Sequence, residues 1–225
     1  MERDRVLIPT FFLRMKTDIM FNRAPYHVRQ YIGETFSGRP IDDFINGDKR
    51  AEFTYPQLQF KVIQGDPCMM AIGHDAVEAM REMMPDLEEV HIEGVAFRVV
   101  EKQIVDEEKQ LGMARTFINY EFATPWIGLN EQNFLQFKYY YREERIAFIN
   151  RLLMQNMRFL SQEFNIPIEN KIVIKSKIRV LTNQSLTTSP TGGFVGEFRA
   201  NFELPDYLSI GNMISKGFGA VHRLG

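Results

Sequence analysis

The order of the predicted elements constrains the fold of this chain more than any other feature. In the first half, Val28, Ile32 and Phe36 recur at helical spacing, whereas residues 57–62 alternate as in a strand with one solvated face. The predicted elements in chain order are a strand at 6–15, a helix from Pro25, strands at 57–62 and 68–72, a helix capped by Asp75, and a strand at 90–105 with Gly94 as a bulge. This order is that of a ferredoxin-like split βαβ unit, in which two helices cover one face of an antiparallel sheet.

The second half of the chain shows the same order of elements without a visible repeat of sequence. Its predicted elements are a strand at 116–123, a long helix from Asn130 to Phe164, strands at 171–181 and 195–202, a short helix from Pro205 to about Ser215, and a strand at 220–224. Residues 107–115 are polar and are the expected boundary. We therefore predict an α+β protein with an N-terminal ferredoxin-like domain at 1–110 and a C-terminal one at 115–225.

Composition narrows the class of protein. The chain has one cysteine and four scattered histidines, so neither a disulfide framework nor a metal site is expected. It shows no signal peptide and no apolar run long enough to span a membrane, so we expect a soluble, cytoplasmic protein. Residues 171–225 hold seven Lys and Arg but three Asp and Glu, although the whole chain has a net charge of −2. This asymmetry favours a polyanionic partner for the C-terminal part.

A basic strand is the first candidate binding feature. Between residues 171 and 180 the odd positions carry four cations and no acid, and alternation places them on one face of a sheet. These cations are Lys171, Lys175, Lys177 and Arg179. They predict contacts with phosphates, and the alternative is an ordinary solvated face.

A glycine-rich loop near the C-terminus is the second candidate. Residues 211–219 end in Ser215, Lys216, Gly217, Phe218 and Gly219, and such a loop can bring backbone amides, a hydroxyl and an ammonium close to a phosphate. The alternative is a helix cap followed by a tight turn. The loop matches neither the P-loop nor the dinucleotide fingerprint, so no nucleotide cofactor is expected.

His27 and Tyr31 are the candidate catalytic pair. They lie four residues apart on the first predicted helix, on a face beside the apolar stripe, so both side chains point the same way. Histidine is the usual general acid or base near neutral pH. The alternative is a surface histidine with no role.

Three segments in order resemble one known family. Residues 193–208, with Gly211 and the loop at 215–219, are similar to the C-terminal signature of the CRISPR-associated repeat-RNA endoribonucleases, in particular their subtype I-B-like branch. Residues 55–62 resemble the tyrosine-proline strand of that branch, which ends in a lysine. Residues 125–130 and the long helix after them resemble its central motif.

The resemblance implies two tandem RRM-like (RAMP) domains and CRISPR repeat RNA as the partner. It implies one cut within each repeat of the precursor RNA, without a metal or other cofactor, leaving a 2′,3′-cyclic phosphate and a 5′-OH. It leaves open whether the processed RNA is retained with other effector subunits, and whether the protein forms a homodimer.

One departure from the family concerns the catalytic histidine. The resemblance implies a histidine in the loop before the tyrosine-proline strand, but residues 42–50 contain none and Asn46 cannot act as a base. Either the sequence has diverged, or the histidine was substituted, or catalysis has moved to His27 and Tyr31, with Lys49 stabilising the phosphorane.

Two other functions compete with a nuclease. A catalytically impaired subunit that only binds repeat RNA agrees with the missing loop histidine. An unrelated α+β protein-interaction module agrees with the acidic first 170 residues and predicts no affinity for RNA.

Overall fold

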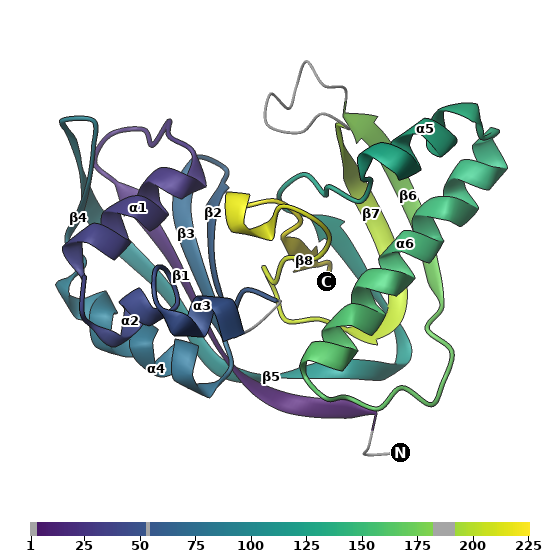
Figure 1. Cartoon of the computed structure of the whole chain (residues 1–225), viewed down its shortest axis with the longest axis horizontal. Helices are drawn as coiled ribbons and strands as arrows, with labels where there is room; N and C mark the ends of the chain where they lie inside the picture. The colour runs from purple at the N-terminus through teal and green to yellow at the C-terminus, as the bar shows by residue number, and fades with distance from the viewer. Residues whose placement is uncertain (1–3, 53–54, 182–191) are drawn as a thin grey trace. The chain divides into compact units, whose positions relative to one another are not determined.

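The structure is a computed structural model that describes residues 4–52, 55–181 and 192–225 (Figure 1). It divides into two compact units. The N-terminal unit comprises Leu7–Lys109 and Ser215–Gly217, and the C-terminal unit comprises Met1–Val6, Gln110–Ile214 and Phe218–Gly225. The chain passes from one unit to the other after residue 6 and again after residue 109, and each of these points lies inside a strand. No helix among the described residues is long and apolar enough to cross a membrane.

The N-terminal unit has the strand order expected of a ferredoxin-like fold. Its elements are β1 (Arg5–Thr17), α1 (Pro25–Thr35), α2 (Pro40–Asp43), α3 (Asp48–Glu52), β2 (Leu58–Ile63), β3 (Asp66–Ile72), α4 (His74–Met83), a 3₁₀ turn (Met84–Asp86), β4 (Glu89–Ile92) and the first part of β5 (Val95–Phe122). The sheet runs β2-β3-β1-β5, and β4 pairs with β5. Buried side chains of α1 and α4, such as Ile32 and Met80, share one core with Leu13 and Phe60 of the sheet.

The hairpin at Glu93 and Gly94 corrects the single strand expected at residues 90–105. Val90 pairs with Phe97 and Ile92 with Val95, so the chain reverses there. Glu93 and Gly94 have φ of 52° and 80°, the backbone that a two-residue hairpin turn requires. Gly94 is therefore a turn residue rather than a bulge.

The face of β2 expected to be solvated is buried. Gln59 and Lys61 both have 0% exposure. Their polar groups are paired, because the Lys61 ammonium donates to Gln59 Oε1 at 2.7 Å and Gln59 Nε2 donates to the Tyr55 hydroxyl at 2.8 Å. Burial lowers the pKa of Lys61 to about 7. Alternation alone could not distinguish a solvated face from a face with satisfied buried polar groups.

The C-terminal unit uses the same strand order. Its elements are the second part of β5, α5 (Glu131–Tyr139), α6 (Arg142–Glu163), β6 (Ile174–Leu181), β7 (Gly193–Glu203) and β8 (Val221–Arg223). β5 lies between β7 and β8, and β6 pairs with β7 and forms the edge. The ferredoxin-like order thus occurs in both units, as the element order predicted.

Three expectations for this half are corrected. Residues 107–115 are not a loop but part of the continuous β5, in which Gly112 and Met113 pair with β7. The long helix is two helices, because Tyr140 and Tyr141 are extended and Glu144 caps the second by accepting from the Tyr141 amide.

The short helix expected from Pro205 to Ser215 is absent apart from a 3₁₀ turn at Ile214–Lys216. The amides of the segment bond across to other strands instead, as Ile210 does to the Gly219 carbonyl at 2.9 Å and Asn212 to the Ile127 carbonyl at 2.8 Å. These cross-chain bonds replace the helical i to i−4 pattern.

Candidate nucleic-acid interface and catalytic residues

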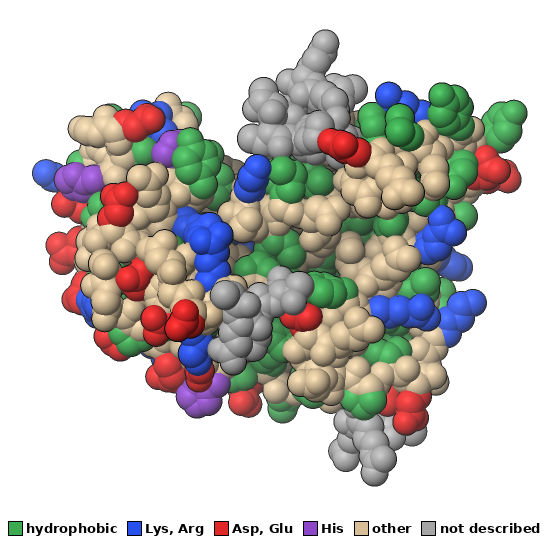
Figure 2. Space-filling model, viewed as in Figure 1, with side chains coloured by type: hydrophobic (Ala, Val, Ile, Leu, Met, Phe, Trp, Pro, Cys, Tyr) green, Lys and Arg blue, Asp and Glu red, His purple; other side chains and the backbone are tan. Residues whose placement is uncertain are grey.

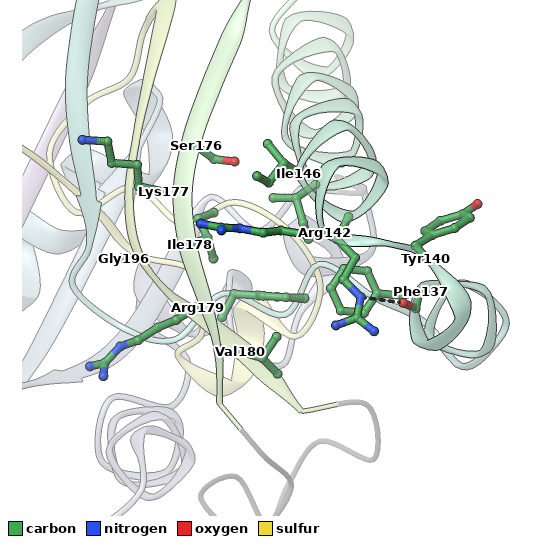
Figure 3. A pocket seen from close by; sticks show the side chains of 13 residues that line it. Phe137, Tyr140, Arg142, Ile146, Ser176, Lys177, Ile178, Arg179, Val180 and Gly196 are labelled. Atoms are coloured by element: carbon green, nitrogen blue, oxygen red, sulfur yellow. Dashed lines mark hydrogen bonds between the residues drawn. The ribbon is translucent and has the colours of Figure 1, made fainter.

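The exposed cations of β6 lie on the face of its sheet opposite to α6. Lys175, Lys177 and Arg179 are exposed, and Figure 3 shows Lys177 and Arg179 pointing away from α6, whereas Ile178 points toward it. Lys171, expected on the same strand, precedes β6 and is exposed. The structure therefore places three of the four predicted cations on one strand face.

β7 adds a fourth cation to this face. Arg199 is the register partner of Lys175, so two positive side chains stand directly opposite each other. No carboxylate among the described residues forms an ion pair with either. Like charges at such a position destabilise a sheet unless an anion lies between them. We name Lys175, Lys177, Arg179 and Arg199 the cation face.

An exposed aromatic ring and a hollow adjoin the cation face. The Arg199 guanidinium lies 5.3 Å from the centroid of the Phe117 ring, which is 43% exposed. A hollow of about 350 Å³ lies next to them. Three members of the cation face line it, together with Asn119, Ser176, Glu197 and Phe198. Cations beside an open aromatic ring are a common arrangement for binding single-stranded nucleic acid.

The glycine-rich loop owes its glycines to close packing. Gly217 has a φ of 89°, and a Cβ there would lie 2.5 Å from Pro25 Cγ and 3.1 Å from the Phe60 carbonyl oxygen. A Cβ on Gly219 would lie 2.0 Å from the Ile210 carbonyl oxygen. Of the other predicted loop residues, Ser215 and Lys216 are exposed and Phe218 is half-buried. Ser215 and Lys216 are therefore the members that can reach a ligand with their side chains.

His27 and Tyr31 line one hollow of about 430 Å³ at the exposed side of α1. His91 and Glu93 of the β4–β5 hairpin line it too. The rings of Tyr31 and His91 are stacked with centroids 6.0 Å apart. His27 Nε2 lies 3.9 Å from a Glu93 carboxylate oxygen, and its buried Nδ1 has no hydrogen-bond partner among the described residues. Tyr26 lines the hollow as well, so it collects two imidazoles and two phenols.

Lys49 is not among the residues that line this hollow. Its ammonium forms an ion pair with Asp75 of α4 and lies 5.9 Å from the centroid of the Phe44 ring. Asn46 in the same loop donates to Asp42 Oδ1 at 2.8 Å, and its amide lies against Gly33 of α1. The structure therefore brings His27 and Tyr31 together and keeps Lys49 at another place in the unit.

Sequence reasoning missed Arg199, Phe117 and His91. The register between β6 and β7 brings Arg199 opposite Lys175, and a register is not readable from one strand. The alternation of β4 does place the His91 side chain outward, but only the fold places it beside Tyr31. No group of three or more His, Cys, Asp or Glu among the described residues is arranged to hold a metal ion.

Comparisons with known proteins match both halves of the chain to the same family. The Cas6b N-terminal domain family matches residues 7–110, and the Cas6b C-terminal domain family matches residues 112–224. An uncharacterized protein of Methanocaldococcus jannaschii is 32% identical over 149 residues, which are 64% of this chain and 99% of that protein.

Solved structures show the same fold. A crystal structure of Cas6b is 25% identical, with a TM-score of 0.82, over 97% of this chain and all of that one. A RAMP protein that binds different RNA substrates matches the fold, with 12% identity and a TM-score of 0.54 over 98% of this chain and all of that one. These matches confirm the two tandem ferredoxin-like folds and exclude an unrelated protein-interaction module. The chain belongs to the Cas6b family of CRISPR endoribonucleases.

Proposed function

We propose that this protein binds CRISPR repeat RNA through the C-terminal unit and cuts the precursor RNA once in each repeat without a metal ion. The observation that carries the binding is the pair of opposed cations, Lys175 and Arg199, with no carboxylate partner among the described residues. A phosphate between them would remove their repulsion. The remaining cation-face residues, with Lys171, Ser215 and Lys216, would contact neighbouring phosphates and fix the position of the strand.

The proposed chemistry is transesterification. A base removes the proton of a ribose 2′-OH, the oxygen attacks the adjacent phosphorus, and the bond from phosphorus to the 5′ oxygen breaks. An acid protonates the leaving oxygen, so the products carry a 2′,3′-cyclic phosphate and a 5′-OH. These steps consume no water and no cofactor.

His27 is the proposed base and Tyr31 the proposed acid. The hollow that they share supports this assignment, because their side chains lie on one side of α1. Lys49, the expected cation for the phosphorane, lies outside this hollow and pairs with Asp75, so it would have to leave Asp75 and move to reach the RNA there.

The test is an assay of the purified protein with repeat RNA from its own array, labelled at the 5′ end, in EDTA. Binding and cleavage are read from the same samples. We expect one cut, and a 5′ fragment whose terminal phosphate resists alkaline phosphatase until acid has opened the cyclic phosphate. Cleavage that occurs only with added Mg²⁺ would contradict the proposed chemistry, and the absence of any binding would contradict the RNA partner.

A second candidate function is binding of repeat RNA without cleavage, as a subunit of an effector complex. The loop at 42–50 favours it, since the resemblance implies a histidine there and the loop contains none. The substitution Asn46→His is the test, because a histidine there can keep a hydrogen bond to Asp42. If the wild-type protein binds but does not cut and Asn46→His cuts, the binding subunit is the correct reading. If the wild-type protein cuts, it is wrong.

A further inference from the structure

A groove lies on the other side of β6 from the cation face, between this strand and the beginning of α6. It has a volume of about 680 Å³. The side chains of Ile178 and Val180 point into it from β6, and those of Arg142 and Ile146 from α6 (Figure 3). We name it the β6–α6 groove.

The walls of the groove are apolar and partly aromatic. Phe137, Tyr140 and Phe194 contribute rings. Ile146 and Val180 are 44% and 49% exposed. Figure 2 shows further hydrophobic side chains exposed over α5. A concave surface of this kind, with few polar groups, is typical of a ligand site.

The charge of the groove restricts what it can hold. Of its four charged lining residues, Lys177 and Arg179 direct their side chains to the other face of the sheet, so the charges that face the groove are those of Arg142 and Arg145. No Asp or Glu in the described chain lines it. Arg145 donates to the Phe137 carbonyl at 3.2 Å and the Lys138 carbonyl at 3.0 Å. Arg142 extends across the groove toward Ile178 and has no hydrogen-bond partner among the described residues (Figure 3). The groove therefore suits a ligand with a flat apolar part and a negative charge.

The groove is continuous with the cation face around the edge of the sheet. Ser176 and Lys177 line both the groove and the hollow beside Arg199. β6 is an edge strand, so no further strand separates the two sides. A polyanion that contacts the cation face can thus pass over the edge and enter the groove.

We propose that the β6–α6 groove holds one unpaired base of the bound RNA. The proposal rests on the function proposed above. The base contacts the aliphatic and aromatic walls, Arg142 binds its edge or stacks on its plane, and Lys177 holds the adjoining phosphate. A protein segment with acidic and apolar side chains has similar chemistry, but the continuity with the cation face favours RNA.

The experiment combines abasic RNA with one arginine substitution. Repeat RNAs with a single abasic nucleotide at each position are titrated with the wild-type protein, Arg142→Ala and Arg158→Ala, with any mapped cut site blocked by a 2′-deoxy nucleotide. Arg158 is exposed on the same helix and outside the groove, so it is the matched control for loss of charge. We expect one abasic position and Arg142→Ala each to weaken wild-type binding roughly 5- to 20-fold, and the combination to cost little more than either change alone.

The outcomes separate this proposal from the proposed function. An additive combination, or equal losses in Arg142→Ala and Arg158→Ala, overturns the base site while RNA binding stands. Full RNA affinity of Arg142→Ala also overturns it and leaves the groove to a protein segment. If the wild-type protein binds no repeat RNA, the proposed function itself fails. A crosslink from 4-thiouridine at the sensitive position to residues 137–149 or 174–181 supports the base site, and a crosslink only elsewhere contradicts it.

Discussion

Many basic side chains of the N-terminal unit pair with carboxylates, whereas those of the cation face form no ion pair among the described residues. Lys16 pairs with Glu101 at 2.8 Å, Arg39 with Asp86 at 2.6 Å and Arg81 with Asp106 at 2.6 Å. Figure 2 shows acidic and basic side chains intermingled over the N-terminal unit. Lys175 and Arg199, by contrast, stand opposite each other. Two units with the same strand order thus differ in their surfaces: one carries paired charges, and the other carries unpaired cations that a bound anion would stabilise.

The candidate groups for proton transfer lie in the other unit. His27, Tyr31 and His91 meet in the N-terminal unit, while the cation face contains no histidine. This difference suggests a division of labour in which the C-terminal unit holds the RNA and the N-terminal unit supplies proton transfer. The following changes test this division, beginning with the largest expected effect.

Replacing His27 should affect cleavage and not binding. We expect His27→Ala to lower the single-turnover cleavage rate by at least about 100-fold, because general base catalysis contributes about 10²- to 10⁴-fold. The dissociation constant for repeat RNA should stay within about 2-fold, since the imidazole is proposed to move a proton and not to hold a phosphate. His74→Ala is the control, because His74 is an exposed histidine of the same unit outside the hollow. A His27→Ala protein that cuts at the wild-type rate would remove catalysis from this hollow.

Removing the opposed cations should have the reverse effect. We expect the double variant Lys175→Ala/Arg199→Ala to weaken RNA binding by roughly 10- to 100-fold and to reduce the slope of log affinity against log salt by about 1.4, as the loss of two phosphate contacts to a single strand predicts. Filter binding over a series of salt concentrations measures both. Lys16→Ala/Arg39→Ala removes two paired cations from the N-terminal unit and should change neither. Equal effects of the two double variants would abolish the distinction between the units.

A side chain at Gly217 should damage the N-terminal unit. A β-branched residue at a φ of 89° is strained, and its Cβ would meet Pro25 and the Phe60 carbonyl. We expect Gly217→Val to lower the free energy of unfolding by about 2 kcal/mol, measured by urea denaturation. Gly38→Val is the control, because Gly38 also has positive φ but nothing lies within 4 Å of its Cβ position. If both variants lose the same stability, backbone strain rather than packing explains the need for Gly217.

Lys61 is a fully buried lysine of the N-terminal unit that pairs with an amide rather than a carboxylate, and it should make stability depend on pH. Its pKa is about 7 in the folded state against 10.5 for a free lysine, so between these values the unfolded state binds more protons. The free energy of unfolding should therefore rise with pH in this window, by up to about 1.4 kcal/mol per unit, and the cost of the buried charge should be fully present below about pH 7. Urea denaturation at several pH values measures the slope.

The variant Lys61→Met isolates this contribution. It should lose the rise in stability between pH 7 and 10, while Lys16→Met, which changes an exposed lysine, should keep it. An identical slope in Lys61→Met and the wild-type protein would show that Lys61 is not a source of the pH dependence.

The architecture could be predicted from the sequence because it depends on local patterns. The stripe of Val28, Ile32 and Phe36 and the alternation in β2 identify their elements, and their order selects the ferredoxin-like topology. Local patterns failed where distant chain segments decide the outcome. The helix expected after Pro205 is replaced by backbone bonds to residues outside the segment, among them the bond from Asn212 to the distant Ile127.

The candidate site was predictable only in part for the same reason. The cations of β6 follow from alternation within one strand. Arg199 and Phe117 join them through the register between strands, and His91 joins Tyr31 through the packing of a hairpin against α1. Arg142 was not recognised because one long helix was expected from Asn130 to Phe164, so the beginning of α6 at Arg142 was not predicted.

Each unit also includes a short segment from the other half of the chain, and this has a consequence for synthesis and folding. Asp4 accepts a hydrogen bond from Asn170, 166 residues away, and belongs to the C-terminal unit. Ser215–Gly217 belong to the N-terminal unit, where Gly217 packs against Pro25 and Phe60. A nascent chain therefore cannot complete its N-terminal unit until Ser215–Gly217 have left the ribosome. Contacts of this sequence separation slow folding, and a chain truncated before the glycine-rich loop would leave both units unfinished.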